Sequence, residues 1–137
     1  MPKESAVPLR GRLNLEVQPT PIIAVPVGDN WYELKFDIIM RETGGVDLRI
    51  ENFTVDALAL RGVPVYSQTY PDTFITDRGY PASIQAGKYL RFNFTKRWPL
   101  PTALLMSGAA ARITARTIDA NGARDATTLR VGVVVAR

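Results

Sequence analysis

The sequence predicts a small all-β domain, and three observations lead to that prediction. Its 137 residues suit a single domain with one hydrophobic core. β-Branched and aromatic residues recur in short clusters, which are separated by 10 glycines and 10 prolines. The strongest clusters alternate apolar and polar residues with a period of two, as half-buried strands do. We therefore expect many short strands joined by turns.

The first strand is expected directly after a polar leader. Residues 1–11 are polar and contain prolines, so we expect a flexible leader followed by a single domain over residues 12–137. Leu13, Leu15 and Val17 then alternate with polar residues, which predicts a strand with one buried face. The N-terminal stretch has no run like the apolar core of a signal peptide.

The next stretch predicts an edge strand, a turn and the clearest strand of the chain. The apolar run 22–25 follows Pro19 and Pro21 and is expected at a sheet edge, where proline is tolerated. The segment 27–30 predicts a turn. Residues 31–41 are the clearest strand, because a run of alternate apolar side chains does not fit the period of a helix. These apolar positions are Tyr32, Leu34, Phe36, Ile38 and Met40.

A change in apolar phase marks the following strand. The glycines of segment 42–45 predict a hairpin turn with positive φ. Apolar residues alternate over 46–50, but the phase has changed by 53–55. One inserted bulge residue near 51–52 would produce such a change. Another short strand is expected to start at 63–66.

The stretch 67–86 is the longest without clear periodicity. We expect a long connection that crosses from one sheet to the other, with or without a short strand at 73–76. It is apolar for a loop, because it contains Tyr70, Phe74 and Tyr80. Long connections often carry function, so this is the first place to look for a binding surface.

The C-terminal third predicts the remaining strands. Residues 89–95 alternate cleanly and predict a strand. For segment 102–111 we favour a loop leading into a strand, and its helical propensity leaves a short helix as the alternative. The motif Asp-Ala-Asn-Gly at 119–122 predicts a hairpin, and the last strand follows over 128–135. The seven to eight expected strands predict an antiparallel β-sandwich with Greek-key connections.

The composition removes several kinds of chemistry. The chain has no cysteine and no histidine, which excludes disulfides, thiol nucleophiles and histidine bases. Asp119 and Asn121 have a spacing used in calcium loops, but the further ligands are missing, so a turn is the simpler interpretation. Glu42 and Thr43 have no partner base in the sequence. We therefore predict no catalytic residue, no cofactor, no metal site and no enzymatic activity.

The positive charge does not predict a nucleic-acid site. The net charge is +4, but the 17 lysines and arginines are spread along the chain, and Lys96-Arg97 is their only adjacent pair. No apolar run reaches the length needed to cross a bilayer. We expect neither a nucleic-acid partner nor a membrane span.

Three segments resemble immunoglobulin-like domains of bacterial secreted and cell-surface proteins. In segment 36–46, a strand ends in Glu-Thr-Gly-Gly-Val. Segment 84–94 has a glycine before an alternating strand, and segment 113–122 ends in the Asp-Ala-Asn-Gly hairpin. The resemblance covers about residues 31–135. It implies an immunoglobulin-like sandwich, a non-enzymatic role and an extracellular, cell-surface or periplasmic location, with a cytoplasmic location as the alternative.

Aromatic side chains outside the main apolar phase are the candidate interaction surface. Exposed rings anchor protein partners or stack on sugars, whereas rings at strand ends often only cover a core. We expect a binding or structural accessory domain that contacts another protein within a larger assembly, with a carbohydrate-binding module as the alternative. The candidate residues are Tyr66, Tyr70, Phe74, Tyr80, Trp31 and Trp98.

Overall fold

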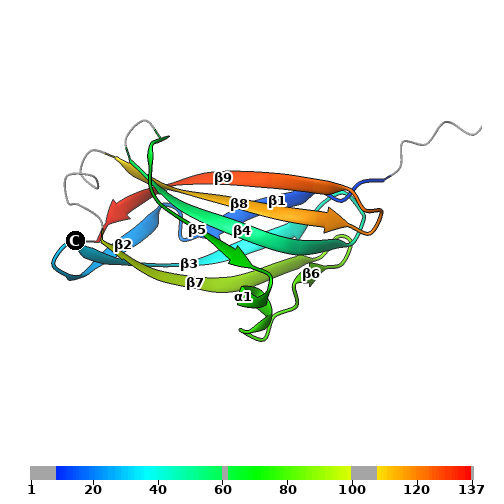
Figure 1. Cartoon of the computed structure of the whole chain (residues 1–137), viewed down its shortest axis with the longest axis horizontal. Coiled ribbons are helices and arrows are strands. Elements are labelled where there is room, and N and C mark those ends of the chain that lie inside the picture. The colour runs from blue at the N-terminus through cyan, green and yellow to red at the C-terminus, as the bar shows by residue number, and fades with distance from the viewer. Residues whose placement is uncertain (1–8, 60–61, 100–107, 137) are drawn as a thin grey trace, which may run out of the picture.

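Nine strands and one short helix make up the described part of the chain (Figure 1). This computed structural model describes residues 9–59, 62–99 and 108–136. It confirms the all-β prediction, with more strands than the seven to eight expected. The elements are β1 (Leu13–Gln18), β2 (Ile22–Gly28), β3 (Trp31–Glu42), β4 (Leu48–Leu58), β5 (Pro64–Pro71), α1 (Thr73–Thr76), β6 (Ser83–Ile84), β7 (Tyr89–Pro99), β8 (Ala109–Asp119) and β9 (Arg124–Val135).

The strands lie in two layers that one strand joins (Figure 1). In one layer, β3 pairs with β7 on one side and with β1 on the other. In the other layer, the order is β9-β8-β4-β5. β2 joins the layers, because it pairs antiparallel with β3 and parallel with β9.

This parallel pair corrects the expectation of a purely antiparallel sheet. Pro19 and Pro21 lack the N–H that would continue the ladder of β1, so the chain leaves β3 and pairs with it again as β2. There β2 runs beside the end of β9, with Ile22 opposite Val133. The run 22–25, which we expected at a sheet edge, therefore lies between two strands, β3 and β9.

Three local predictions are confirmed. The alternate apolar side chains of β3 are buried, and Phe36 is only 2% exposed. The register of β4 against β8 shifts between Ile50 and Asn52, which accounts for the change of apolar phase. The predicted hairpin joins β8 and β9, and its Gly122 has a positive φ of 84°.

Two predicted connections differ from the observed ones. Segment 42–45 is not a hairpin, because β3 and β4 pair with strands of different layers. The crossover predicted over 67–86 starts later, because β5 extends to Pro71 and its polar outward side chains hide the strand period. The optional strand at 73–76 is the helix α1, in which local bonds such as Asp77 N–H to the Thr73 carbonyl replace a ladder.

Two predictions fall partly outside the described residues. Of the expected leader, residues 1–8 are not described, and the described Gly11 is buried. Of the expected loop or helix at 102–111, residues 102–107 are not described. From Ala109 onwards the chain is strand β8.

Aromatic rings from both layers and from the crossover form the centre of the core. The ring centroid of Phe53 lies 5.1 Å from that of Tyr70, 5.4 Å from that of Phe74 and 5.6 Å from that of Phe92. The crossover also contributes Ile75, which is fully buried. α1 therefore packs over the side of the core between β5 and β7 (Figure 1).

The buried carboxylate of Glu42 holds the loops at one end of the molecule. Its residue is 1% exposed, and its oxygens accept hydrogen bonds only from backbone N–H groups of the described residues. Burial raises the pKa of Glu42, but the backbone donors together outweigh it, so its pKa lies below the usual value. The donors are Arg12, Gly44, Gly45 and Gly87.

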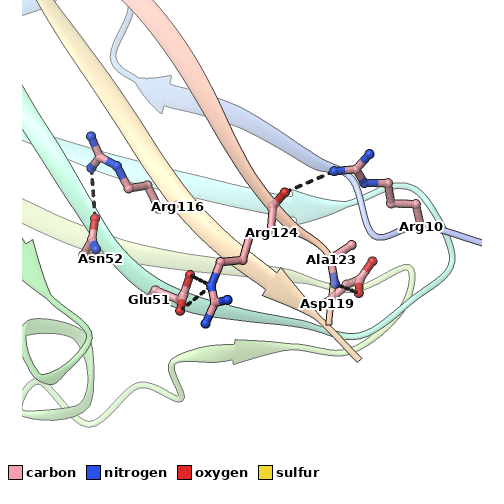
Figure 2. A network of polar contacts seen from close by, with 7 residues as sticks. All are labelled: Arg10, Glu51, Asn52, Arg116, Asp119, Ala123 and Arg124. Atoms are coloured by element: carbon pink, nitrogen blue, oxygen red, sulfur yellow. Dashed lines mark hydrogen bonds and ion pairs between the residues drawn. The ribbon is translucent and has the colours of Figure 1, made fainter. Parts of the chain in front are cut away.

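Asp119 has a matching role in the turn between β8 and β9 (Figure 2). Its carboxylate accepts the N–H groups of Gly11, Asn121 and Ala123, each at 2.9 Å. These bonds, the one from Gly11 above all, lower the pKa of Asp119. The Asp-Ala-Asn spacing thus fixes a turn and ties the N-terminal segment to it.

Candidate functional site

The six predicted aromatic residues differ widely in exposure. Tyr70 is 4% and Trp98 is 5% exposed, so both rings belong to the core. Tyr66 and Phe74 are half-buried and pack against that core. The last two, Tyr80 at 39% and Trp31 at 47% exposure, remain on the surface. Tyr80 and Trp31 are therefore the exposed rings of the predicted set.

The structure does not bring these six residues to one place. Tyr70 and Phe74 meet at 4.8 Å between ring centroids, and Tyr66 stacks on Trp98 at 6.3 Å. Trp31 lies opposite Pro99, at the far end of the β3–β7 ladder from the crossover. Of the predicted set, Tyr80 lines a hollow that described residues form in the molecular surface.

That hollow, which we call the tyrosine hollow, lies beside β7 where the crossover passes. It measures about 530 Å³. Tyr80 and Pro81 of the crossover and Tyr89 of β7 bring exposed rings to it, and Tyr89 is 59% exposed. Asp37 of β3 and two polar residues of β7 complete its wall. The lining residues are Asp37, Tyr80, Pro81, Tyr89, Leu90, Arg91, Phe92 and Asn93.

The polar part of the hollow is fixed by hydrogen bonds across β3 and β7. Arg91 Nε donates to Asp37 Oδ2 at 2.8 Å, and its Nη2 donates to Gln18 Oε1 at 3.1 Å. Asn93 donates to the other oxygen of Asp37 at 3.3 Å. The bond from Arg91 leads the causes that lower the pKa of Asp37, so this carboxylate stays ionised at neutral pH. The hollow therefore presents a preorganised pair of opposite charges.

The exposed ring of Tyr89 is also held in place. The guanidinium of Arg41 lies 5.1 Å from its ring centroid, within the range of a cation–π contact. Tyr80 is supported from the core side, where its ring centroid lies 6.4 Å from that of Phe92. Two positioned rings beside planar polar groups can bind a peptide segment or a sugar.

Sequence reasoning missed most of this site. Part of the site could have been found from the alternation of β7, which places Tyr89, Arg91 and Asn93 on one outward face. The sequence does not reveal that Asn93 lies opposite Asp37 across the ladder, because that register depends on a strand pair far apart in the chain.

Within the described ranges, no group of three or more Asp and Glu side chains is arranged to hold a metal ion. The same residues contain no helix long and apolar enough to cross a membrane.

No protein-family model matches this sequence, and no curated protein matches it significantly. Among solved structures, a protein assigned as ApaA from Bordetella pertussis is 14% identical with a TM-score of 0.63, and the match covers 93% of this chain and 96% of that one. A Northeast Structural Genomics Consortium target, SoR45, is 9% identical with a TM-score of 0.60, covering 90% and 86%. The CARDB domain of the PF1109 protein from Pyrococcus furiosus is 14% identical with a TM-score of 0.41, covering 96% and 95%. The first two share the fold of this chain, and their low identity says nothing about its ligands.

Proposed function

We propose that this chain is a non-catalytic binding or structural accessory domain that contacts another protein through the tyrosine hollow. The observation that carries the proposal is that two exposed rings, Tyr80 and Tyr89, line the same hollow as the hydrogen-bonded pair Arg91–Asp37. Tyrosine and arginine are the side chains that dominate binding energy at protein interfaces. The polar groups of the hollow need no rearrangement when a partner binds, because Arg91 and Asn93 already hold the Asp37 carboxylate in place.

We also propose that the fold is an immunoglobulin-like sandwich with Greek-key connections. It is supported by three connections that change layer, from β3 to β4, from β5 to β7 and from β7 to β8. The parallel pairing of β2 with β9 fits an N-terminal strand that passes from one layer to the other. Strands of such domains serve mainly as a scaffold, and loops and faces carry the contacts.

We also propose that the domain works outside the cytoplasm, at the cell surface or in the periplasm of a bacterium. The support is the resemblance of segments 36–46, 84–94 and 113–122 to domains of exported bacterial proteins. Protease treatment of intact cells that make the protein tests this location. Digestion before lysis is expected for a surface protein, and release on opening the outer membrane for a periplasmic one. Protection until the cytoplasm is opened contradicts both.

Site-specific photo-crosslinking tests the protein contact. A photoreactive amino acid replaces Tyr89 in the hollow or Thr95, which is exposed on the same face of β7 outside it. The cells that make the protein are then irradiated. A discrete adduct from position 89 and none from position 95 is the expected result. Equal adducts at both positions, or none at position 89, would contradict the proposal.

A carbohydrate is the second candidate ligand, because the hollow combines rings with planar hydrogen-bonding groups. Asp37, Arg91 and Asn93 supply both donors and acceptors beside Tyr89. A glycan array with the purified domain tests this candidate, followed by the same array with Tyr89→Ala and with Thr95→Ala. Binding that Tyr89→Ala abolishes and Thr95→Ala preserves supports a sugar. An array without bound glycans rejects the sugar and leaves the crosslinking result to decide the protein contact.

A further inference from the structure

The outer face of the β9-β8-β4-β5 layer carries three rows of side chains in strict register. In the first row, Ser67, Asp56, Arg112 and Arg130 lie side by side across four strands. The second row contains Thr69, Thr54, Thr114 and Thr128. The third row contains Pro71, Asn52, Arg116 and Ala126. A band of hydroxyls is therefore bordered by guanidinium groups on both sides.

The threonine row is linked by hydrogen bonds that fix the hydroxyl groups. Thr54 and Thr69 share a bond of 2.8 Å between their Oγ1 atoms, and Thr114 and Thr128 share one of 3.2 Å. Arg116 joins this row from the side, because its Nη1 donates to the Thr54 hydroxyl at 3.0 Å. The band is thus an ordered surface of donors and acceptors.

Two arginines directly oppose each other at one corner of this face. Arg112 and Arg130 are cross-strand partners on β8 and β9, where like charges destabilise the sheet. Asp56 compensates one of them, through a bond of 2.9 Å to Arg112 Nε. Among the described residues, neither the terminal nitrogens of Arg112 nor any nitrogen of Arg130 has a hydrogen-bond or ion-pair partner. The corner carries one uncompensated positive charge and outward-facing donor groups.

A hollow of about 480 Å³ opens beside this corner. Its lining is hydroxyl-rich and includes Arg112 and Arg116 at its two ends. Figure 2 shows Arg116 on β8, held by a bond of 2.9 Å from its Nη1 to Asn52 Oδ1. The lining residues are Thr54, Asp56, Ser67, Thr69, Arg112, Thr114, Arg116 and Thr128.

We infer that this face binds a glycan that carries oxyanions, with one carboxylate or sulfate seated between Arg112 and Arg130. Guanidinium groups recognise such oxyanions through paired, charge-assisted hydrogen bonds. The adjacent hydroxyls of Thr114 and Thr128 match the hydroxyl groups of a sugar chain. A bound oxyanion relieves the repulsion between the two arginines.

The composition of the three rows favours a glycan over other polyanions. The rows hold no aromatic side chain, and single-stranded nucleic acids are bound by stacking on rings. They also lack a large apolar side chain, which the desolvated centre of a protein interface requires. This site lies on the opposite layer from the tyrosine hollow, so it stands independently of the function proposed above.

Binding measurements with four polymers and three forms of the domain test the inference. The polymers are alginate for the carboxylate, dextran sulfate for the sulfate, neutral dextran, and polyglutamate as an acidic peptide. The three forms are the unaltered domain, Arg130→Gln, and Lys35→Gln as a control that removes the same charge from the outward face of β3. All three are compared at one ionic strength, because exposed charges are screened by salt.

We expect Arg130→Gln to weaken binding of alginate, of dextran sulfate or of both about tenfold, since it removes charge-assisted hydrogen bonds. Whichever of the two polymers loses affinity identifies the oxyanion. Lys35→Gln is expected to change the affinity less than about twofold. Four results would overturn the inference: no binding of either anionic glycan, equal binding of neutral dextran, an equal loss in Lys35→Gln, or polyglutamate binding of the same strength and Arg130 dependence.

Discussion

The carboxylate of Glu42 accepts a hydrogen bond from the backbone N–H of Gly87 at 3.0 Å, although 45 residues separate them in the sequence. Glu42 ends β3, and Gly87 lies in the turn that leads into β7. The Glu42 carboxylate also accepts hydrogen bonds from the N–H groups of Arg12 and of the segment after β3. One side chain therefore joins three separate parts of the chain.

Replacing Glu42 by glutamine should weaken the fold. Glutamine offers one oxygen in place of two and loses the charge that strengthens these hydrogen bonds. We expect Glu42→Gln to lower the free energy of unfolding by about 2 kcal/mol. Urea denaturation measures this loss, with Glu16→Gln on the polar face of β1 as the control. A control as unstable as Glu42→Gln would show that the backbone donors to Glu42 are not the cause.

The same carboxylate predicts a loss of stability in acid. The pKa of Glu42 lies below its ordinary value of 4.5, and that of Asp119 below 3.8. A group with a lowered pKa in the folded state stabilises the fold above its unfolded pKa, and this stability disappears as the pH falls through the folded pKa. The urea midpoint should therefore fall below about pH 4.5, and less steeply in Glu42→Gln than in the unaltered domain. Parallel pH profiles of the two forms would contradict the assignment.

A methyl group at Gly44 should be poorly tolerated. A Cβ atom there would overlap the backbone carbonyl oxygen of Arg10 and lie 2.9 Å from the backbone nitrogen of Arg12. Gly44→Ala should therefore cost about 2 kcal/mol of unfolding free energy. Gly132→Ala is the control, because the nearest atom to its new Cβ is a side-chain carbon of Pro21 at 4.0 Å. Equal thermal midpoints for the two variants would mean that the N-terminal segment does not pack here.

Phe53 should be the most sensitive aromatic residue. Its ring contacts rings of β5, of β7 and of the crossover, so its removal leaves a cavity where both layers meet. Phe53→Ala should lower the free energy of unfolding by about 3–5 kcal/mol. The exposed Tyr89→Ala should cost less than about 1 kcal/mol in the same denaturation experiment. That contrast also establishes that Tyr89→Ala is suitable for the binding tests.

The two tryptophans should report two environments. Trp98 is 5% exposed, whereas Trp31 is 47% exposed. Acrylamide should therefore quench one part of the fluorescence readily and leave the other protected. The variant Trp31→Phe should lose the readily quenched part. Full protection of both tryptophans would show that Trp31 is covered in solution.

The sequence predicted the strands whose outward and inward faces differ most. The alternation in 31–41 gave β3 to within one residue, and the phase change near 51–52 located the bulge in β4. These features are local, since one buried face imposes a period of two on neighbouring residues. The same dependence on alternation made the predicted β5 too short. Ser67 and Thr69 continue the strand, but they differ little in polarity from their neighbours, so no apolar alternation marks them.

The candidate site was less predictable, because it depends on which strands are neighbours. Tyr80 was in the predicted set, but Asp37 joined it only through the register of β3 against β7. Glu42 was assigned to a hairpin edge, yet it is a buried acceptor for donors from distant segments. The exposure of a ring also depends on which strands are neighbours. Trp98 was predicted to lie on the surface, but β7 pairs with β3 and the ring is buried in the core.

The parallel pairing of β2 with β9 has a mechanical consequence. The described chain enters at one end of the molecule and leaves at the opposite end (Figure 1). Tension on the two ends would pull β2 and β9 in opposite directions along their length. The hydrogen bonds between Ile22–Ala24 and Val133–Val135 would then bear the force together, in shear, instead of opening one after another.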